Sequence, residues 1–360
     1  MKTIGILTFH RAYNFGAVLQ AYALQKTISN MGKNCEVIDY RNPRIENSFH
    51  SASMKSKLLS VIKYVVYHNY FVEGKRKAKL FADFTEKYLE LSECYKGSEQ
   101  FKDCYEKIIV GSDQVWNIEM TQGDKNFFLP YKEGALKLSY AASFGKKSFS
   151  KENEYIMSEL LKDFENLYVR ESAGKDIVNR LLKKEATTVV DPTLLIDSSC
   201  WRKIAFQPTK ITKKYILLYL VADETYSIEL AKNIAKAKNL EVIYVDPPRF
   251  QFEGITRLKE VGPAEFLWLV MKAEYVITTS YHGLIFSLNL NTPFLFEKAN
   301  NIGNTNSRLD EIVQLFGLEK YAIKSSNALD YNGLEYDWKR INSRIEEERK
   351  KSLALLEKIV

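Results

Sequence analysis

The sequence has 360 residues, of which 46% are hydrophobic and 27% are charged. These fractions are ordinary for globular proteins and exclude wholesale disorder, a collagen-like chain and a coiled-coil rod. The net charge of +7 is spread over this length, which favours anionic small molecules or an anionic membrane surface over nucleic acid as partners.

Short apolar runs alternate with helical periods along the whole chain. In the first half, the pattern predicts strands at 3–9, 35–39, 107–111, 138–143, 166–170 and 187–190, with helices near 16–31, 54–71, 76–89, 152–164 and 171–183. In the second half, it predicts strands at 215–221, 240–245, 274–279 and 293–297, with helices near 226–238, 263–272, 282–290 and 308–316. Buried runs rich in Val and Ile between helices are typical of parallel sheets.

Two such series in a row predict an α/β protein with two Rossmann-like, doubly wound domains. The boundary is expected near Asp191, because a strand ends there and Pro192 blocks its continuation. We therefore expect an N-terminal domain over 1–195, a C-terminal domain over 196–335, and a charged final helix in 336–360 that bridges the two.

The first candidate motif is the turn at residues 10–16, HRAYNFG, between a strand and a helix. The free N–H groups and partial positive charge of a helix N-terminus can hold an anion or a sugar hydroxyl. The alternative is a plain turn in which Asn14 caps the helix. The turn is not G-x-G-x-x-G, so it gives no support to a nicotinamide cofactor.

The second candidate motif is VGSDQVWN at 110–117, again at the carboxyl end of a strand, where open α/β sheets bind ligands. Trp116 could stack on a sugar ring, and Asp113 could accept a proton from a hydroxyl group. The alternative places Asp113 as the cap of a turn and Trp116 in the core.

Two further motifs supply candidate cations. Arg170 ends a buried strand, so it either pairs with a distant acid or binds an anionic ligand; Glu171 points elsewhere if the strand continues. The segment 278–284, TTSYHGL, turns from a strand into a helix, with Ser280 as its cap and His282 on its first turn. Such a turn is a natural phosphate site, whereas the alternative is a histidine with purely structural contacts.

Residues 55–79 carry seven lysines and arginines beside apolar residues. A basic amphipathic helix can lie on an anionic membrane, and the alternative is a helix docked on the sheet with a solvated charged face. The sequence shows no apolar run long enough to span a membrane, and the apolar run at its start is too short to predict a signal peptide. We expect a cytoplasmic protein, at the inner face of the membrane if 55–79 contact it.

The usual motifs for ATP hydrolysis, zinc proteolysis and serine esterase chemistry are missing. The four cysteines (Cys35, Cys94, Cys104 and Cys200) stand far apart, as expected of reduced thiols. We expect no cofactor, no metal and no nucleic-acid partner. What remains is transfer chemistry on an anionic donor, between two α/β domains.

Seven segments, in this order, resemble the polysaccharide pyruvyl transferase family: NFGAVLQAYALQ at 14–25, VGSDQVWN at 110–117, SYAASFG at 139–145, VRES at 169–172, DPTLL at 191–195, TTSYHGLIFSLNL at 278–290 and SRLDEIVQLFGL at 307–318. The resemblance implies two Rossmann-like domains that face a cleft, as in GT-B glycosyltransferases. It also implies transfer of an enolpyruvyl unit from phosphoenolpyruvate to a sugar of a cell-surface polysaccharide or of its lipid-linked precursor. The product is a pyruvate ketal, and phosphate is released.

The resemblance also implies roles for particular residues. The family's donor-binding arginine and histidine match Arg170 and His282, and Lys298 is the candidate for a third cation on an anionic donor. His282 is the candidate acid and Asp113 the candidate base. Ser280 and Gly283 complete the expected donor side, and the expected acceptor side consists of Asn14, Gly16, Asp113, Gln114, Trp116 and Asn117.

Two other functions stay open at this point. One is a nucleotide-sugar glycosyltransferase, since the same fold supports that chemistry. The other is a non-catalytic glycan-binding paralogue, which would bind an acceptor but release no phosphate.

Overall fold

The structure is a computed structural model that describes residues 3–42, 61–208, 211–221, 225–245, 253–298, 307–324 and 333–360. Within these ranges the side chains of 61–73, 225 and 307 are not described. The predicted helix at 54–71 therefore lies partly outside the described residues.

The first half of the chain forms a sheet with the strand order β3-β2-β1-β4-β5-β6-β7, in which every pair of neighbours is parallel. The strands are β1 (Ile4–Leu7), β2 (Cys35–Tyr40), β3 (Leu91–Tyr95), β4 (Lys107–Val110), β5 (Leu136–Ala142), β6 (Asn166–Val169) and β7 (Thr187–Thr188). The helices of this half are α1 (Phe15–Asn30), α3 (Val61–Tyr88), α4 (Lys151–Leu161) and α5 (Ser172–Leu182).

The second half forms another fully parallel sheet, with the order β10-β9-β8-β11-β12. Its strands are β8 (Tyr215–Tyr219), β9 (Glu241–Val245), β10 (Thr256–Leu258), β11 (Tyr275–Thr278) and β12 (Phe294–Phe296). The helices are α6 (Ser198–Ile204), α7 (Thr225–Lys238), α8 (Pro263–Lys272), α9 (Tyr281–Leu290), α10 (Ser307–Phe316) and α11 (Trp338–Ile359). The predicted α/β class with two Rossmann-like domains is confirmed.

The sequence pattern missed three elements, and the reasons are local. β3 and β10 lie at the edges of their sheets and are partly exposed, so LSECY and TRL lack the apolar runs of the central strands. α6 is only seven residues long, which is too short to show a helical period. The helices predicted at 54–71 and 76–89 are one continuous helix from Val61 onward, α3.

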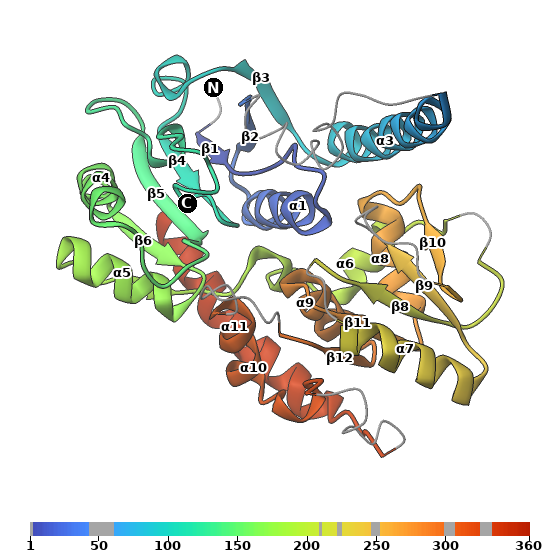
Figure 1. Ribbon diagram of the computed structural model, residues 1–360. Helices are drawn as coiled ribbons and strands as arrows, with labels where there is room; N and C mark the ends of the chain where they lie inside the picture. The colour runs from blue at the N-terminus through green and yellow to red at the C-terminus, as the bar shows by residue number, and fades with distance from the viewer. Residues whose placement is uncertain are drawn as a thin grey trace.

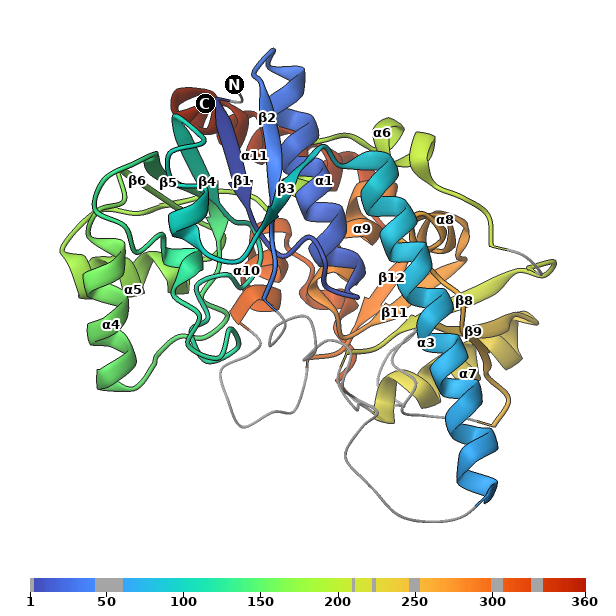
Figure 2. The same ribbon diagram turned by 90° about the horizontal axis from the view of Figure 1, so that it is seen from above.

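Helix α1 lies between the two sheets (Figures 1 and 2) and contacts α8 and α9 of the second half. Phe15 stacks on Phe266 of α8, with ring centroids 4.5 Å apart and planes 3° apart, and meets the edge of Tyr219 at 5.8 Å. Because neighbours cover α1 on most sides, nearly all of its residues are buried. One hydrophobic core therefore runs from the first sheet through α1 into the second sheet.

Helix α11 contacts both halves, and its C-terminal end lies beside the first sheet (Figure 1). Ser352 Oγ accepts a hydrogen bond from the backbone of Val190 at 3.1 Å, and Arg349 Nε donates to the carbonyl of Leu194 at 2.6 Å. The same helix packs on α9 and α10. On this basis we propose the division into 1–195, 196–335 and a bridging helix in 336–360, whose exact limits stay a prediction.

In the described part of residues 55–79, the helix α3 docks against α8. Arg76 forms an ion pair with Glu260 at 2.5 Å, and the ammonium of Lys77 lies 5.4 Å from the ring centre of Phe15. These contacts fit the docked-helix alternative for 74–79, whereas 55–60 lie outside the described residues. None of the described helices combines the length and the apolar character needed to cross a membrane.

Substituting Phe15→Ala should destabilise the protein by about 3–5 kcal/mol, the usual cost of removing a buried phenyl ring. The ring is 1% exposed and joins α1 to α8, so the loss affects the contact between the halves. Phe206→Ala removes a phenyl ring that is 63% exposed and should change stability by less than about 0.5 kcal/mol. Denaturant unfolding of both variants checks this; equal losses would contradict the role given to Phe15.

Candidate functional site

The candidate site lies where the order of the first sheet reverses. β1 is flanked by β2 on one side and β4 on the other, so the segments after β1 and β4 diverge at the carboxyl edge of the sheet. In open α/β sheets this is the position of the ligand crevice. The second and the first candidate motifs, at 110–117 and 10–16, both start here.

Hydrogen bonds lock these two segments together. Thr8 Oγ1 donates to the carbonyl of Ser112 at 3.0 Å, and Gln20 Nε2 donates to Thr8 Oγ1 at 2.8 Å. The backbone of Ser112 donates to Gln20 Oε1 at 3.0 Å. Asp113 follows with a left-handed backbone (φ 68°), which is costly for a residue with a side chain and is held by this network.

Arg170 follows β6 directly and is surrounded by carboxylates. Its Nη1 donates to Asp191 Oδ2 at 2.9 Å, its Nη2 lies 3.5 Å from Asp113 Oδ1, and its Nε lies 3.6 Å from Glu171 Oε2. The side chain of Arg170 is 1% exposed. Its guanidinium carbon also lies 4.7 Å from the ring centre of Tyr281, so an aromatic face covers one side.

Several polar atoms in this cluster have no hydrogen bond to any described residue. They are Nε and Nη2 of Arg170, Oε2 of Glu171, Nε2 of His282 and Nε of Arg308. Buried donors and acceptors normally find partners, because an unpaired one costs about 1–3 kcal/mol. Both cations and a histidine thus carry donor or acceptor capacity that a bound ligand can satisfy.

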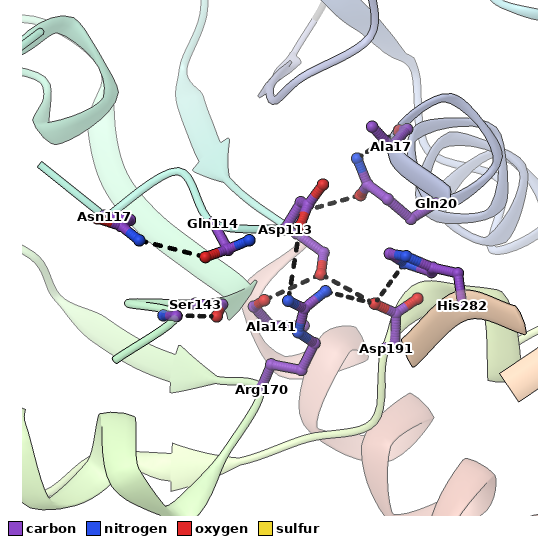
Figure 3. Close-up of polar contacts among 12 residues, drawn as sticks. Ala17, Gln20, Asp113, Gln114, Asn117, Ala141, Ser143, Arg170, Asp191 and His282 are labelled. Atoms are coloured by element: carbon purple, nitrogen blue, oxygen red, sulfur yellow. Dashed lines mark hydrogen bonds and ion pairs between the residues drawn. The ribbon is translucent and has the colours of Figure 1, made fainter. Parts of the chain in front are cut away.

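His282 lies on the first turn of α9, and Figure 3 shows Asp191 between His282 and Arg170. His282 Nε2 is 3.5 Å from the same Asp191 oxygen that accepts from Arg170. On its other side, the imidazole packs on the N-terminus of α1, where any Cβ at Gly16 would overlap the ring. Glycine is therefore required at position 16 to let α1 and α9 approach.

The electrostatics of the cluster are set by burial and close charges. Burial alone would raise the pKa of Asp191, but the contacts from His282 and Arg170 outweigh it and hold that pKa well below its usual range. Burial likewise opposes the charge on Arg170, while Tyr281, Asp191 and the other acidic groups raise its pKa. Burial, with repulsion from Arg170, lowers the pKa of Arg308.

The structure brings two of the predicted donor residues together, since Arg170 and His282 contact one carboxylate oxygen. The sequence left open whether Arg170 pairs with a distant acid or binds an anionic ligand. In the structure it pairs with a distant acid, Asp191. The strand does not continue through Glu171: β6 ends at Val169 and Glu171 takes the N-cap position of α5. The carboxylate of Glu171 therefore lies beside Arg170 and does not point elsewhere. Ser280 caps α9, accepting from the backbone of Gly283 at 3.4 Å, as predicted.

Lys298 follows β12 and forms an ion pair with Asp310 at 2.6 Å. No hydrogen bond or ion pair joins it to Arg170 or His282 within the described part of the chain, and its donor role stays a prediction. Arg308 is not among the site residues predicted from the sequence, and its guanidinium carbon lies 5.9 Å from the ring centre of Tyr281. The only sequence signal for Arg308 was its place in SRLDEIVQLFGL.

The structure corrects one acceptor residue. Trp116 is fully buried, its Nε1 donates to the carbonyl of Phe127 at 3.2 Å, and phenylalanine rings pack around it. No face of the indole is available for a sugar, so the core alternative holds for Trp116. The indole N–H is satisfied by a backbone carbonyl inside the fold, so Trp116 can be buried completely. The sequence alone does not show that this carbonyl lies within reach.

The other expected acceptor residues lie at the same sheet edge. Asn14 caps α1, accepting from the backbone of Ala17 at 3.2 Å, as the capping alternative states. Asn117 Nδ2 donates to Gln114 Oε1 at 3.2 Å, and Asn117 Oδ1 accepts from the backbone of Met120. These contacts order the turn and leave the acceptor role of Asn14, Gln114 and Asn117 a prediction.

A family model described as polysaccharide pyruvyl transferase matches residues 14–296. The chain therefore belongs to the polysaccharide pyruvyl transferase family. No curated protein matches the chain.

Solved structures with a similar fold cover nearly the whole chain. A putative UDP-N-acetylglucosamine 2-epimerase from Listeria monocytogenes has 10% identity and a TM-score of 0.50, covering 98% of this chain and 90% of its own. S. aureus MnaA, solved with UDP, has 12% identity and a TM-score of 0.47, with coverages of 96% and 88%. The Streptomyces sp. SF2575 glycosyltransferase SsfS6, complexed with thymidine diphosphate, has 9% identity and a TM-score of 0.45, with coverages of 99% and 100%. At such identities the likeness concerns the fold alone, which is of the GT-B kind.

Asp191→Asn should destabilise the protein by about 3–5 kcal/mol, because it leaves the buried Arg170 without its closest counter-charge. The matched control is Asp176→Asn on α5, which neutralises an exposed carboxylate and should change stability by less than about 0.5 kcal/mol. Denaturant unfolding measures both. A loss no larger than that of the control would show that Asp191 does not support Arg170.

Comparing the wild type with Asp191→Asn at several pH values gives a second test. The pKa of Asp191 is lower in the folded protein than in the unfolded chain, where it is about 3.9. Its contribution to stability is therefore complete above about pH 4 and is lost as the pH falls through the folded value. The stability gap between wild type and Asp191→Asn should stay constant near neutrality and shrink in acid; a gap that widens in acid would contradict this.

Proposed function

We propose that this member of the polysaccharide pyruvyl transferase family transfers an enolpyruvyl unit from phosphoenolpyruvate to a sugar of a cell-surface polysaccharide or of its precursor. The observation that supports the proposal best is the shared contact of Arg170 and His282 with Asp191, beside guanidinium N–H groups that lack hydrogen bonds. A guanidinium suits carboxylate and phosphate oxygens, and a carboxylate-paired histidine suits proton transfer.

The proposed reaction forms one C–H bond and two C–O bonds. It breaks the carbon–carbon π bond of the donor, the C–O bond to phosphate and the O–H bonds of two sugar hydroxyls. A proton adds to the methylene carbon of the donor, and a sugar hydroxyl oxygen then bonds to the neighbouring carbon. A second hydroxyl replaces phosphate and closes the ketal. The two hydroxyl protons balance the one taken up by carbon and the one that leaves with phosphate. His282 is the proposed acid, and Asp113 the proposed base.

The net charge of the cluster indicates which protonation state favours donor binding. Arg170 and Arg308 face three carboxylates, those of Asp113, Glu171 and Asp191. With a neutral His282 this set has one excess negative charge, which repels a donor carrying about three. A proton on His282 removes the excess and is the same proton that the reaction consumes. We therefore propose that the donor binds to the protonated form of His282.

The remaining donor contacts are part of the proposal. Ser280 and Gly283 start α9, whose N-terminal N–H groups favour a phosphate. Lys298 supplies the third cation if it exchanges its partner Asp310 for the donor. Because the Arg170 side chain is 1% exposed, a donor reaches its guanidinium only after the groups covering it move.

The proposed acceptor side consists of Asn14, Gly16, Asp113, Gln114 and Asn117. A cytoplasmic location and a membrane contact of 55–79 also stay predictions.

Phosphoenolpyruvate should raise the melting temperature of the wild-type protein, because a ligand that binds only the folded state stabilises it. UDP and GDP at the same concentrations should have no such effect. In a panel of free and lipid-linked glycans, at least one should then trigger phosphate release. Stabilisation by UDP or GDP instead would point to a nucleotide-sugar glycosyltransferase, and glycan binding with no phosphate release to a non-catalytic paralogue.

His282→Gln should lower kcat by roughly 10²–10⁴-fold, the scale expected for the loss of a general acid, while the donor still binds. Glutamine keeps some hydrogen bonding but cannot give up a proton. Thermal shifts with phosphoenolpyruvate measure binding separately from turnover. If the variant instead binds phosphoenolpyruvate poorly but converts the bound donor at the wild-type rate, His282 acts only as a ligand of the anion and not as the acid.

A further inference from the structure

A second polar hollow lies at the same sheet edge, on the other side of β1 from Arg170. It has a volume of about 510 Å³ and is formed by the ends of β2 and β3 and by residues 122–126 of the segment after β4. In the strand order, β2 and β3 are on one side of β1, while β6, which positions Arg170, is on the other. We call this hollow the basic pocket; its charged residues are Arg41, Lys96, Asp124 and Lys125.

The acid of the basic pocket is already engaged by the protein. Asp124 Oδ2 accepts from Tyr40 Oη at 2.8 Å and from Asn42 Nδ2 at 2.6 Å, while Asp124 Oδ1 accepts from the backbone and side chain of Asn126. Burial, with the nearby charge of Asp124, raises the pKa of Tyr40, so its phenol keeps the proton that it donates. Asp124 thus fixes the wall of the pocket to the end of β2.

The bases outnumber the acids around this wall. Arg41 shares Asp39 with Arg11, each at 2.8 Å, so one buried carboxylate faces two guanidinium groups. Lys96 and Lys125 are exposed, and neither ammonium forms an ion pair with a described residue. Three bases against one acid in the lining give the pocket two excess positive charges when these groups are ionised. The cluster around Arg170 has the opposite excess.

We infer that the basic pocket binds an acidic saccharide, one that carries a phosphate or carboxylate group. Lys96 and Lys125 are suited to the oxyanion, since ammonium groups on flexible stems bind anionic oxygens as point charges. Among the polar side chains of the lining, the exposed amide of Gln122 carries both a donor and an acceptor, which are the hydrogen-bonding groups that sugar hydroxyls need. That this saccharide is a part of the acceptor rests on the proposed function; the binding itself does not.

The test is a calorimetric titration of the full chain, without phosphoenolpyruvate, with three probes: phosphorylated maltotriose, tri-galacturonic acid and neutral maltotriose. At least one acidic probe should bind more tightly than maltotriose. Lys96→Ala/Lys125→Ala should weaken that binding by about tenfold, the scale of losing two exposed charge contacts. The probe that responds identifies phosphate or carboxylate as the group recognised.

The matched control is Lys151→Ala/Lys175→Ala on α4 and α5, which removes the same charge from exposed lysines on the other side of the sheet. It should bind the acidic probe as the wild type does, and both double variants should keep the wild-type melting temperature. Equal weakening by the two double variants, or no preference of the wild type for either acidic probe, would overturn the inference. If phosphoenolpyruvate fails to stabilise the protein but the lysine effect persists, the proposed function fails and the pocket stands.

Discussion

The site depends on one buried carboxylate, Asp191, that is shared by both halves of the chain. Its Oδ2 accepts from Arg170 at the end of β6 and contacts His282 at the start of α9. Its Oδ1 accepts from the backbone and the hydroxyl group of Thr193 at 3.0 and 2.8 Å, which fixes the carboxylate. A charge buried this deeply is tolerated only when such partners surround it. The position of the histidine relative to the arginine is therefore set by Asp191.

The packing of α1 makes this shared contact possible. Phe15 carries the hydrophobic core from the first sheet to α8, and Gly16 leaves the space that His282 occupies. These two neighbouring positions on one turn of helix thus have different roles. The stacked ring of Phe15 fixes the distance between the two halves, and the absence of a side chain at Gly16 lets the imidazole reach Asp191.

The fold could be predicted from the sequence because its central strands are buried on both faces and read as unbroken apolar runs. The edge strands β3 and β10 could not, since exposure on one side removes that signal. Within the site, the motifs located Arg170 and His282 but not what they contact. The sequence marks Asp191 as a strand end and as the start of the DPTLL segment but not as a partner of His282, because that contact joins positions far apart in the sequence.

Local context also misled in an instructive way. Trp116 stands among polar residues in the sequence, yet the chain turns there and buries the indole against Phe144 and Phe164. Glu171 would point away from Arg170 if the strand continued, yet that strand ends two residues before Glu171. In both cases the direction of a side chain depends on where a turn falls, and a turn of this kind has no periodic signal.

The cluster around Arg170 and the region at the end of β2 have opposite net charges, and both lie at the carboxyl edge of the first sheet. On the side of β6, two arginines face three carboxylates, whereas on the side of β2, one carboxylate faces two arginines. β1 lies between these two regions. An anion at this edge is therefore attracted toward the end of β2 and repelled near Asp113, unless a residue of the Arg170 cluster takes up a proton. The imidazole of His282 is the group of that cluster that becomes a cation when it takes up a proton. Proton uptake and the approach of an anion to Arg170 are thus physically coupled, since each lowers the electrostatic free energy of the other.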